Sequence, residues 1–252
     1  MSTVTRRAPA SVGPPERRFG TRVLLAGGAL VLVAVPFALL LFLVEDKWRP
    51  LERADAGARD DLHGYAADHG PFVTAMRLLS DVGSAPVYLA MFAVVIGWLL
   101  SRRLARLAAF VAVTVLGSSL LNQVVKMAVD RARPVLPDPV AHANGMSFPS
   151  GHAQAAMVAY SVLLLVLLPV LRGAWRSVFV SVAVLIVLAI GFSRVALGVH
   201  YVTDVVAGYV LGAAWVAAMT AAFNTWRADR GQRKTPLEEG LEPEAGPQPD
   251  AR

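Results

Sequence analysis

Three groups of polar and ionisable residues interrupt an otherwise apolar chain, and their residue types suit the chemistry of a phosphate group. Ionisable side chains near a membrane boundary are costly to place there, so they are candidates for function. The three groups are Lys126 with Arg133-Pro134, then Pro149-Ser150-Gly151-His152, and then Ser193-Arg194 with His200 and Asp204.

Five of these residues could hold a phosphate. Lys126, Arg133 and Arg194 are three positive charges with no matching cluster of acids. Each charge-assisted bond to a phosphate oxygen contributes about 1.5–3 kcal/mol. Ser150 and Gly151 stand where a helix is predicted to begin, so free backbone N–H groups and the helix dipole there favour an anion. Gly151 also lets the backbone approach a ligand closely.

Two histidines and an aspartate could carry out a reaction at that phosphate. His200 and Asp204 are four residues apart in the predicted first turn of a helix, so they share a face. A carboxylate on one imidazole nitrogen leaves the other nitrogen free to attack phosphorus. His152 could then protonate the leaving oxygen. These roles predict a phosphohistidine intermediate that water hydrolyses, with no metal and no other cofactor, because the cations stabilise the charge.

Each group alone also has an ordinary structural explanation. Lys126 would be an interfacial residue whose ammonium reaches the headgroups, and Asp204 would be a charge favoured at a helix N-terminus. Their joint occurrence in order favours the catalytic interpretation. We expect Asp81 to be a cap or turn residue, and Asn122 and Gln123 to form polar packing between helices. The remaining histidines are expected at the surface: His63, His69 and His142.

The elements that must position these residues are membrane-spanning helices. Of the 252 residues, 56% are hydrophobic and 17% charged, and the mean hydropathy is +0.53. Soluble domains have about 45–50% apolar and about 25% charged residues. About 20 apolar residues cross the hydrocarbon core. We therefore expect an all-α, polytopic membrane bundle of about six helices, over residues 22–44, 82–100, 104–125, 153–171, 177–197 and 201–223.

The loops that carry the three groups are predicted to lie on one face of the membrane. The first two groups flank the connection between the third and fourth spans, and the last group lies between the fifth and sixth. Odd-numbered loops share a face whichever way the protein is oriented. Basic residues at the N-terminus, in 102–106, in 172–176 and in 227–234 mark the opposite face. The positive-inside rule then places both termini in the cytoplasm and the site on the extracytoplasmic face of the cytoplasmic membrane.

Outside the predicted membrane domain of residues 22–223, the sequence predicts a polar N-terminal tail over 1–21 and a disordered C-terminal tail over 224–252. Residues 45–81 are an outer-face connection, either an amphipathic helix on the membrane surface or a solvated loop with a few buried anchors. Cysteine is absent, which excludes disulfides and thiolate sites. The net charge of +6 is scattered around apolar runs, which indicates topology rather than nucleic-acid binding.

The three groups resemble the motifs of the type 2 phosphatidic acid phosphatase family of integral membrane lipid phosphatases. That family shares its site with soluble acid phosphatases and vanadium haloperoxidases. Its motifs are Lys, six residues, Arg-Pro; Pro-Ser-Gly-His; and Ser-Arg, five residues, His, three residues, Asp, and all are complete here. The resemblance implies that His200 is the nucleophile, Asp204 its orienting partner and His152 the acid. The implied phosphate-binding residues are Lys126, Arg133, Ser150, Gly151 and Arg194.

We therefore expect a lipid phosphate or diphosphate phosphohydrolase. The resemblance implies undecaprenyl diphosphate, phosphatidylglycerophosphate or phosphatidate as candidate substrates. The sequence indicates membrane lipids as surroundings, and no obligate protein partner is readable from it. A lipid-linked phosphoryl transferase would use the same residues. A non-catalytic lipid carrier or flippase would use the basic pocket but would not need the pair of His200 and Asp204. The lipid tail, the headgroup, the preference for mono- or diphosphate and the oligomeric state stay open at this point.

Overall fold

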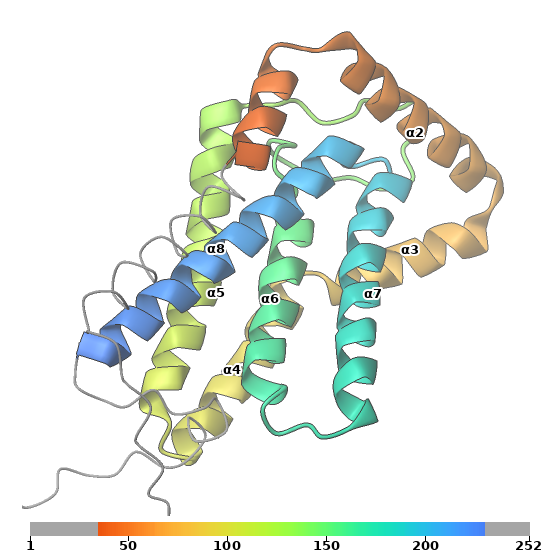
Figure 1. Ribbon diagram of the computed structural model, residues 1–252. Coiled ribbons are helices and arrows are strands. Elements are labelled where there is room, and N and C mark those ends of the chain that lie inside the picture. The colour runs from red at the N-terminus through yellow and green to blue at the C-terminus, as the bar shows by residue number, and fades with distance from the viewer. Residues whose placement is uncertain (1–34, 230–252) are drawn as a thin grey trace, which may run out of the picture.

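A computed structural model describes residues 35–229, and all regular structure in that range is helical (Figure 1). The predicted N-terminal tail, the first part of the first predicted span and residues 230–252 lie outside the described residues. The helices in chain order are a segment Val35–Glu45, α2 (Arg49–Asp68), α3 (Gly70–Val82), α4 (Ala85–Ser101), α5 (Ala105–Val129), α6 (Gly151–Leu167), α7 (Ala174–Ala196) and α8 (Val202–Asp229).

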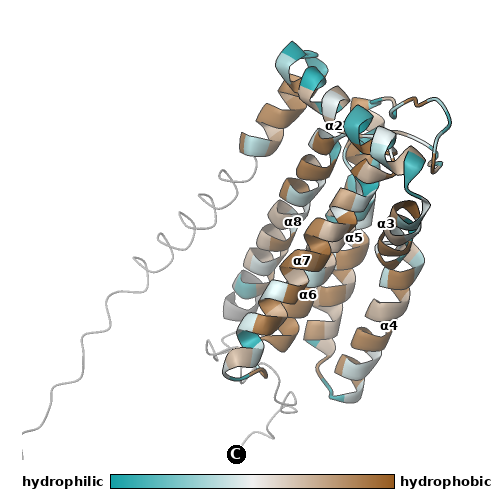
Figure 2. Cartoon of the chain, turned by 90° about the vertical axis from the view of Figure 1, so that its right-hand side faces the viewer, coloured by the Kyte–Doolittle hydropathy of each residue, from teal (hydrophilic) through white to brown (hydrophobic). Residues whose placement is uncertain are grey.

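Several of these helices are suited to cross a membrane. α5, α7 and α8 are each long and apolar enough, and α3 with α4 passes as one span bent by 41°. The segment Val35–Glu45 and α6 are apolar but shorter, so the count of six spans stays a prediction. Large apolar side chains such as Val94, Leu120 and Leu185 are exposed on these helices. Such surfaces suit lipid, and Figure 2 shows that the hydrophilic residues gather towards α2 at one end.

Two predicted boundaries are corrected by the structure. The helix predicted to begin at 82 begins at Ala85, because α3 occupies the chain up to Val82 and Gly83 follows as its C-cap. Pro86 stands in the first turn of α4, where its missing N–H leaves no helical hydrogen bond unmade. At the other end α8 continues to Asp229. A helix therefore occupies residues 224–229, which the sequence had assigned to a disordered tail.

α6 and α8 approach each other closely because α8 carries two glycines on the facing side. A Cβ at Gly208 would lie 2.7 Å from the backbone oxygen of Ser150, and a Cβ at Gly212 would lie 3.0 Å from that of Gln154. Glycines four residues apart share a helix face, and small residues allow such contacts between membrane helices. The contact places the start of α6 beside the first turn of α8.

The segment between α5 and α6 and the turn between α7 and α8 lie at the same end of the bundle, together with α2 (Figure 1). Ala66, Val73 and Met76 of α2 and α3 form a hydrophobic cluster with Leu197 and Val199 of that turn. The solvated-loop alternative for residues 45–81 is therefore wrong, because two helices form there and pack on the end of the bundle that carries the three groups.

Candidate active site

The structure brings the three groups together at this end of the bundle, as the parity of the loops predicts. His152, at the start of α6, lies within electrostatic range of the other predicted site residues. Those residues are Lys126 in the last turn of α5, Arg133 after α5, Arg194 in the last turn of α7, and His200 before α8. Side chains from four separate parts of the chain thus form one cationic cluster.

His200 and Asp204 form a buried pair. Nδ1 of His200 lies 3.4 Å from Oδ2 of Asp204, and the two residues are 2% and 0% exposed. The prediction that both lie on one helical turn is wrong, because α8 begins at Val202 and His200 belongs to the preceding turn. The carboxylate still reaches the imidazole because its Oδ2 also accepts the backbone N–H of Tyr201 at 2.9 Å, which folds the turn over it.

Arg133 fixes the other side of the His200 ring. Its Nη1 lies 3.1 Å from Nε2 of His200 and also donates to the carbonyl oxygen of Val199 at 2.7 Å. A guanidinium can only donate, so Nε2 must accept and the ring proton must sit on Nδ1, facing Asp204. Burial lowers the pKa of His200 to about 4, although Asp204 acts in the opposite direction. The ring is therefore neutral at pH 7, with its lone pair on Nε2.

The other cations predicted to bind phosphate have no carboxylate partner in the part of the chain that the structure describes, and one of them has a free N–H donor. Lys126 Nζ donates to the carbonyl oxygen of Met146 at 2.7 Å, and Nη1 of Arg194 donates to Oγ of Ser80. Arg194 is only 8% exposed, and its Nε has no hydrogen-bond partner. Among the described residues, Lys126, Arg133 and Arg194 form no ion pair with a carboxylate. The cluster therefore carries a surplus of positive charge that suits an anion.

Ser150 is also poised for a ligand, but in a different way from the prediction. It occupies the N-cap position of α6 without a side-chain capping bond, and its buried Oγ has no partner. Its backbone N–H is not free, however, because it donates to the carbonyl oxygen of Asp204 at 2.9 Å. Buried polar atoms without partners are uncommon. The hydroxyl of Ser150, rather than its amide, is thus the group available to an anion.

Gly151 has a packing role beside its predicted one. A Cβ at this position would lie 3.3 Å from Oδ1 of Asn122, so a glycine eases the contact between α5 and α6. Asn122 is buried and donates to Oε1 of Gln154 at 2.6 Å, which confirms polar packing between these helices. Gln123 is exposed and does not take part in that packing.

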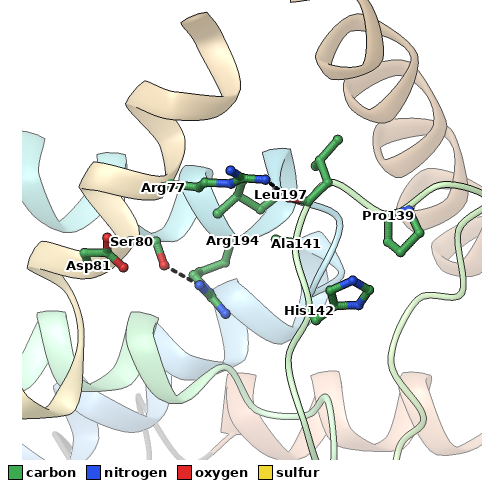
Figure 3. A pocket seen from close by; sticks show the side chains of 9 residues that line it. Arg77, Ser80, Asp81, Pro139, Ala141, His142, Arg194 and Leu197 are labelled. Carbon is green, nitrogen blue, oxygen red and sulfur yellow. Dashed lines mark hydrogen bonds between the residues drawn. The ribbon is translucent and has the colours of Figure 1, made fainter. Parts of the chain in front are cut away.

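A cavity of about 400 Å³ opens beside Arg194, between α3 and the segment that follows α5 (Figure 3). Its wall includes Asp81 and His142, for which the sequence suggested only a cap and a surface position. Arg77 of α3 donates to the carbonyl oxygen of Val140 at 2.6 Å and so ties the two walls together. A molecule entering this cavity meets the guanidinium of Arg194.

Sequence reasoning missed the residues that hold Asp204 from behind. Ser147 Oγ donates to its Oδ2, and Arg131 Nη1 donates to its Oδ1 at 2.6 Å. Arg131 in turn pairs with Asp55 of α2 at 3.0 Å. Arg131 stands two residues before Arg133, inside the first motif, and that position is the signal that could have identified it. Asp55 gave no comparable signal, because the sequence did not tell which face of α2 is buried.

The chain is also similar to known proteins. Residues 106–228 match the model of the PAP2 superfamily. This segment, which carries all three motifs, belongs to the PAP2 superfamily. The chain is 44% identical to phosphatidylglycerophosphatase B of Bacillus subtilis (strain 168) over 96 residues, which are 37% of this chain and 46% of that protein. It is 32% identical to lipid A 1-phosphatase of Rhizobium etli over 122 residues, which are 45% of this chain and 48% of that protein. The matches thus span about half the length of these relatives.

A solved structure supports the fold across more of the chain. The crystal structure of a transmembrane PAP2-type phosphatidylglycerolphosphate phosphatase from Bacillus subtilis superposes with a TM-score of 0.70 at 23% identity. The match covers 82% of this chain and 98% of that one. The PAP2 chain described here therefore has the fold of an integral membrane protein, with all three motifs inside the superfamily segment.

Proposed function

We propose that this PAP2 protein is a membrane lipid phosphate or diphosphate phosphohydrolase that acts through a phosphohistidine intermediate. One observation carries the proposal: His200 has Nδ1 towards Asp204 and Nε2 towards Arg133, in a cluster with surplus positive charge. An oriented neutral imidazole supplies a nucleophile, and the cations supply a site for the phosphate that it attacks. Binding alone would not require the buried carboxylate behind the ring.

The first step transfers the phosphoryl group to His200. A phosphate oxygen accepts the hydrogen bond that Arg133 Nη1 otherwise donates to His200, which frees the lone pair of His200 Nε2. His152 enters the step as an imidazolium, whose charge is balanced by the bound phosphate. The bond between Nε2 and phosphorus forms as the bond between phosphorus and the lipid-side oxygen breaks, and that oxygen takes the extra proton of His152, so the lipid leaves protonated. The carboxylate of Asp204 stabilises the positive charge that the imidazole acquires. Arg133, Arg194 and Lys126 stabilise the phosphate oxygens.

The second step regenerates the enzyme. Water attacks the phosphorus, His152 takes a proton from that water, and the bond between phosphorus and Nε2 breaks. Inorganic phosphate leaves, and His200 returns to its neutral form with the proton on Nδ1. The proton that His152 gave in the first step is thereby restored, so the cycle balances without a metal ion.

The relatives support a lipid substrate. Their names, phosphatidylglycerophosphatase B and lipid A 1-phosphatase, both describe phosphate esters of lipids. Undecaprenyl diphosphate, phosphatidylglycerophosphate and phosphatidate are the candidates to test. The cavity beside Arg194 has room for polar groups of a substrate near that guanidinium.

The arrangement of basic turns supports a site on the extracytoplasmic face of the cytoplasmic membrane. The turn between α4 and α5 contains Arg102 and Arg103, and Arg172 lies between α6 and α7. Both turns lie at the end of the bundle opposite to the turn between α7 and α8, which contains His200 (Figure 1). Basic loops favour the cytoplasmic side, so the opposite end faces outward.

A phosphate-release panel tests the proposal. Wild-type protein, His200→Ala and the control His69→Ala, which alters an exposed histidine, are purified in detergent and given the three candidate lipids labelled with ³²P at the terminal phosphate. We expect phosphate release and labelled protein for the wild type and for His69→Ala, and neither for His200→Ala. Chelators should leave the rate unchanged. Label transferred to another lipid would identify a transferase, and a wild type that binds but never cleaves any of the lipids would refute the proposal.

A further inference from the structure

α2 places one carboxylate deep against the catalytic end of α8. Asp55 is 2% exposed, although α2 as a whole is a polar helix with many exposed residues. A buried carboxylate is costly unless its oxygens are bonded. Here Oδ1 accepts the backbone N–H of Thr203 at 3.0 Å, and Oδ2 accepts Oγ1–H of Thr203 at 2.5 Å and Nη2–H of Arg131 at 3.0 Å.

The first of these bonds makes Asp55 a cap supplied from another helix. The first backbone N–H groups of a helix have no partner within it, and a negative charge is favoured there. Thr203 is the second residue of α8, and Asp204 is the third. By bonding Thr203, Asp55 holds the turn that presents Asp204 to His200.

The bond with Arg131 links Asp55 to the reacting pair. Nη1 of Arg131 donates to Asp204 Oδ1 at 2.6 Å and to Thr203 Oγ1 at 2.7 Å, while its guanidinium lies 4.2 Å from the centre of the Tyr201 ring. Asp55 therefore shares the charge of Arg131 with Asp204. Without Asp55, the whole positive charge of Arg131 would interact with Asp204. The Asp204 carboxylate would then stabilise a positive charge on the imidazole less well.

We propose that Asp55 is a positioning residue of the active site, which acts through Arg131 and the first turn of α8 to keep the Asp204 carboxylate directed at Nδ1 of His200. This inference rests on the proposed function, because it assigns His200 as the nucleophile. It gives the connection between the first span and α4 a role in the reaction. α2 therefore does more than pack on the end of the bundle that carries the three groups.

A test of this inference must change Asp55 without changing the charged groups that act on His200 directly. The ring is influenced by Asp204 from α8, by Arg133 from the segment after α5, by Arg194 from α7 and by His152 from α6. Asp55→Asn changes none of these groups. It keeps the shape and an oxygen for the Thr203 N–H, but it removes the charge and turns an NH₂ donor towards Nη2 of Arg131 and Oγ1 of Thr203, so the bond with Arg131 is lost. Asp61→Asn, on the exposed side of the same helix, is the matched control.

The experiment measures both turnover and the state of the imidazole. For Asp55→Asn we expect kcat to fall about 10- to 100-fold, the range found for groups that orient metal-ligating side chains from behind. KM should change less than about threefold because the phosphate-binding residues stay in place. In ¹⁵N-histidine spectra at pH 7, with His200 assigned by its absence from His200→Ala, the population with the proton on Nδ1 should fall. Asp61→Asn should match the wild type in both measurements.

The outcomes are distinguishable. If Asp55→Asn lowers the yield or the unfolding temperature but the folded protein keeps its kcat and its His200 spectrum, Asp55 is only a structural cap and the inference is overturned. If the wild type releases no phosphate from any lipid, the proposed function fails. The His200 spectrum then still decides, by itself, whether Asp55 controls the imidazole.

Discussion

Replacing Asp204 by asparagine should abolish most of the turnover without preventing substrate binding. Both carboxylate oxygens face donors: Oδ1 faces Arg131, and Oδ2 faces Ser147, the Tyr201 N–H and His200 Nδ1. The amide of an asparagine must turn its NH₂ towards one of these sides. If the NH₂ replaces Oδ1, it faces the guanidinium of Arg131, which is also a donor. If it replaces Oδ2, it faces the Tyr201 N–H and donates to Nδ1 of His200, which must then accept.

The size of the effect follows from these contacts. Loss of one charge-assisted hydrogen bond costs about 1.5–3 kcal/mol, which is about 10- to 150-fold in rate. An imidazole that accepts at Nδ1 carries its proton on Nε2 and cannot attack, and a wrong tautomer has been worth about 10⁴ in serine proteases. We therefore expect kcat to fall about 10²- to 10⁴-fold for Asp204→Asn, with KM within about threefold because the phosphate-binding cations remain.

Rapid-quench measurement of the ³²P-labelled protein with a lipid phosphate gives the rate of the first step directly. Asp130→Asn is the control, because Asp130 is an exposed C-cap in the left-handed conformation that asparagine also adopts. An Asp204→Asn protein that keeps a third or more of the wild-type rate of phosphoprotein formation would show that the carboxylate does not orient the nucleophile, and the assignment of His200 would have to be withdrawn.

Three further predictions concern neighbouring features. Because burial holds the pKa of His200 at about 4, its ¹⁵N spectrum should stay that of a neutral ring as the pH falls from 7 to about 5, where about 90% remains neutral; a midpoint near 6.5 would contradict this. Ser150→Ala removes a hydroxyl that has no internal partner, so kcat/KM should fall about two- to tenfold with an unchanged unfolding temperature, and a matching loss of stability would argue against a ligand role. Gly208→Ala places a Cβ against α6 and should cost about 1–3 kcal/mol of stability, seen as a lower unfolding temperature in detergent, whereas Gly97→Ala, which meets nothing within 4 Å, should not.

The sequence alone was enough to predict the class of the fold and that the three groups lie at one end of the bundle. Apolar runs of the length of a membrane span are a local property, and the alternation of loops between two faces follows from counting them. Lys126, Arg133, Ser150, His152, Arg194, His200 and Asp204 could therefore be assigned to one end before any contact was known. Positions near the helix boundaries were misplaced, such as His200, which precedes α8 instead of lying on it, and the exposed side of α5 at Gln123 was also not predicted.

The contacts that hold these residues, and the tautomer of His200, follow only from the packed structure. That Arg133 bonds Nε2 of His200, and so fixes its tautomer, depends on the path of the segment between α5 and α6, which has no repeating pattern to read. Asp55 lies 148 positions from Thr203 in the chain, and its burial is possible only because Arg131 and Thr203 meet it there. A buried carboxylate is stable only where folding supplies hydrogen-bond donors and an opposite charge. The buried face of α2 could therefore be identified only from the packed helices.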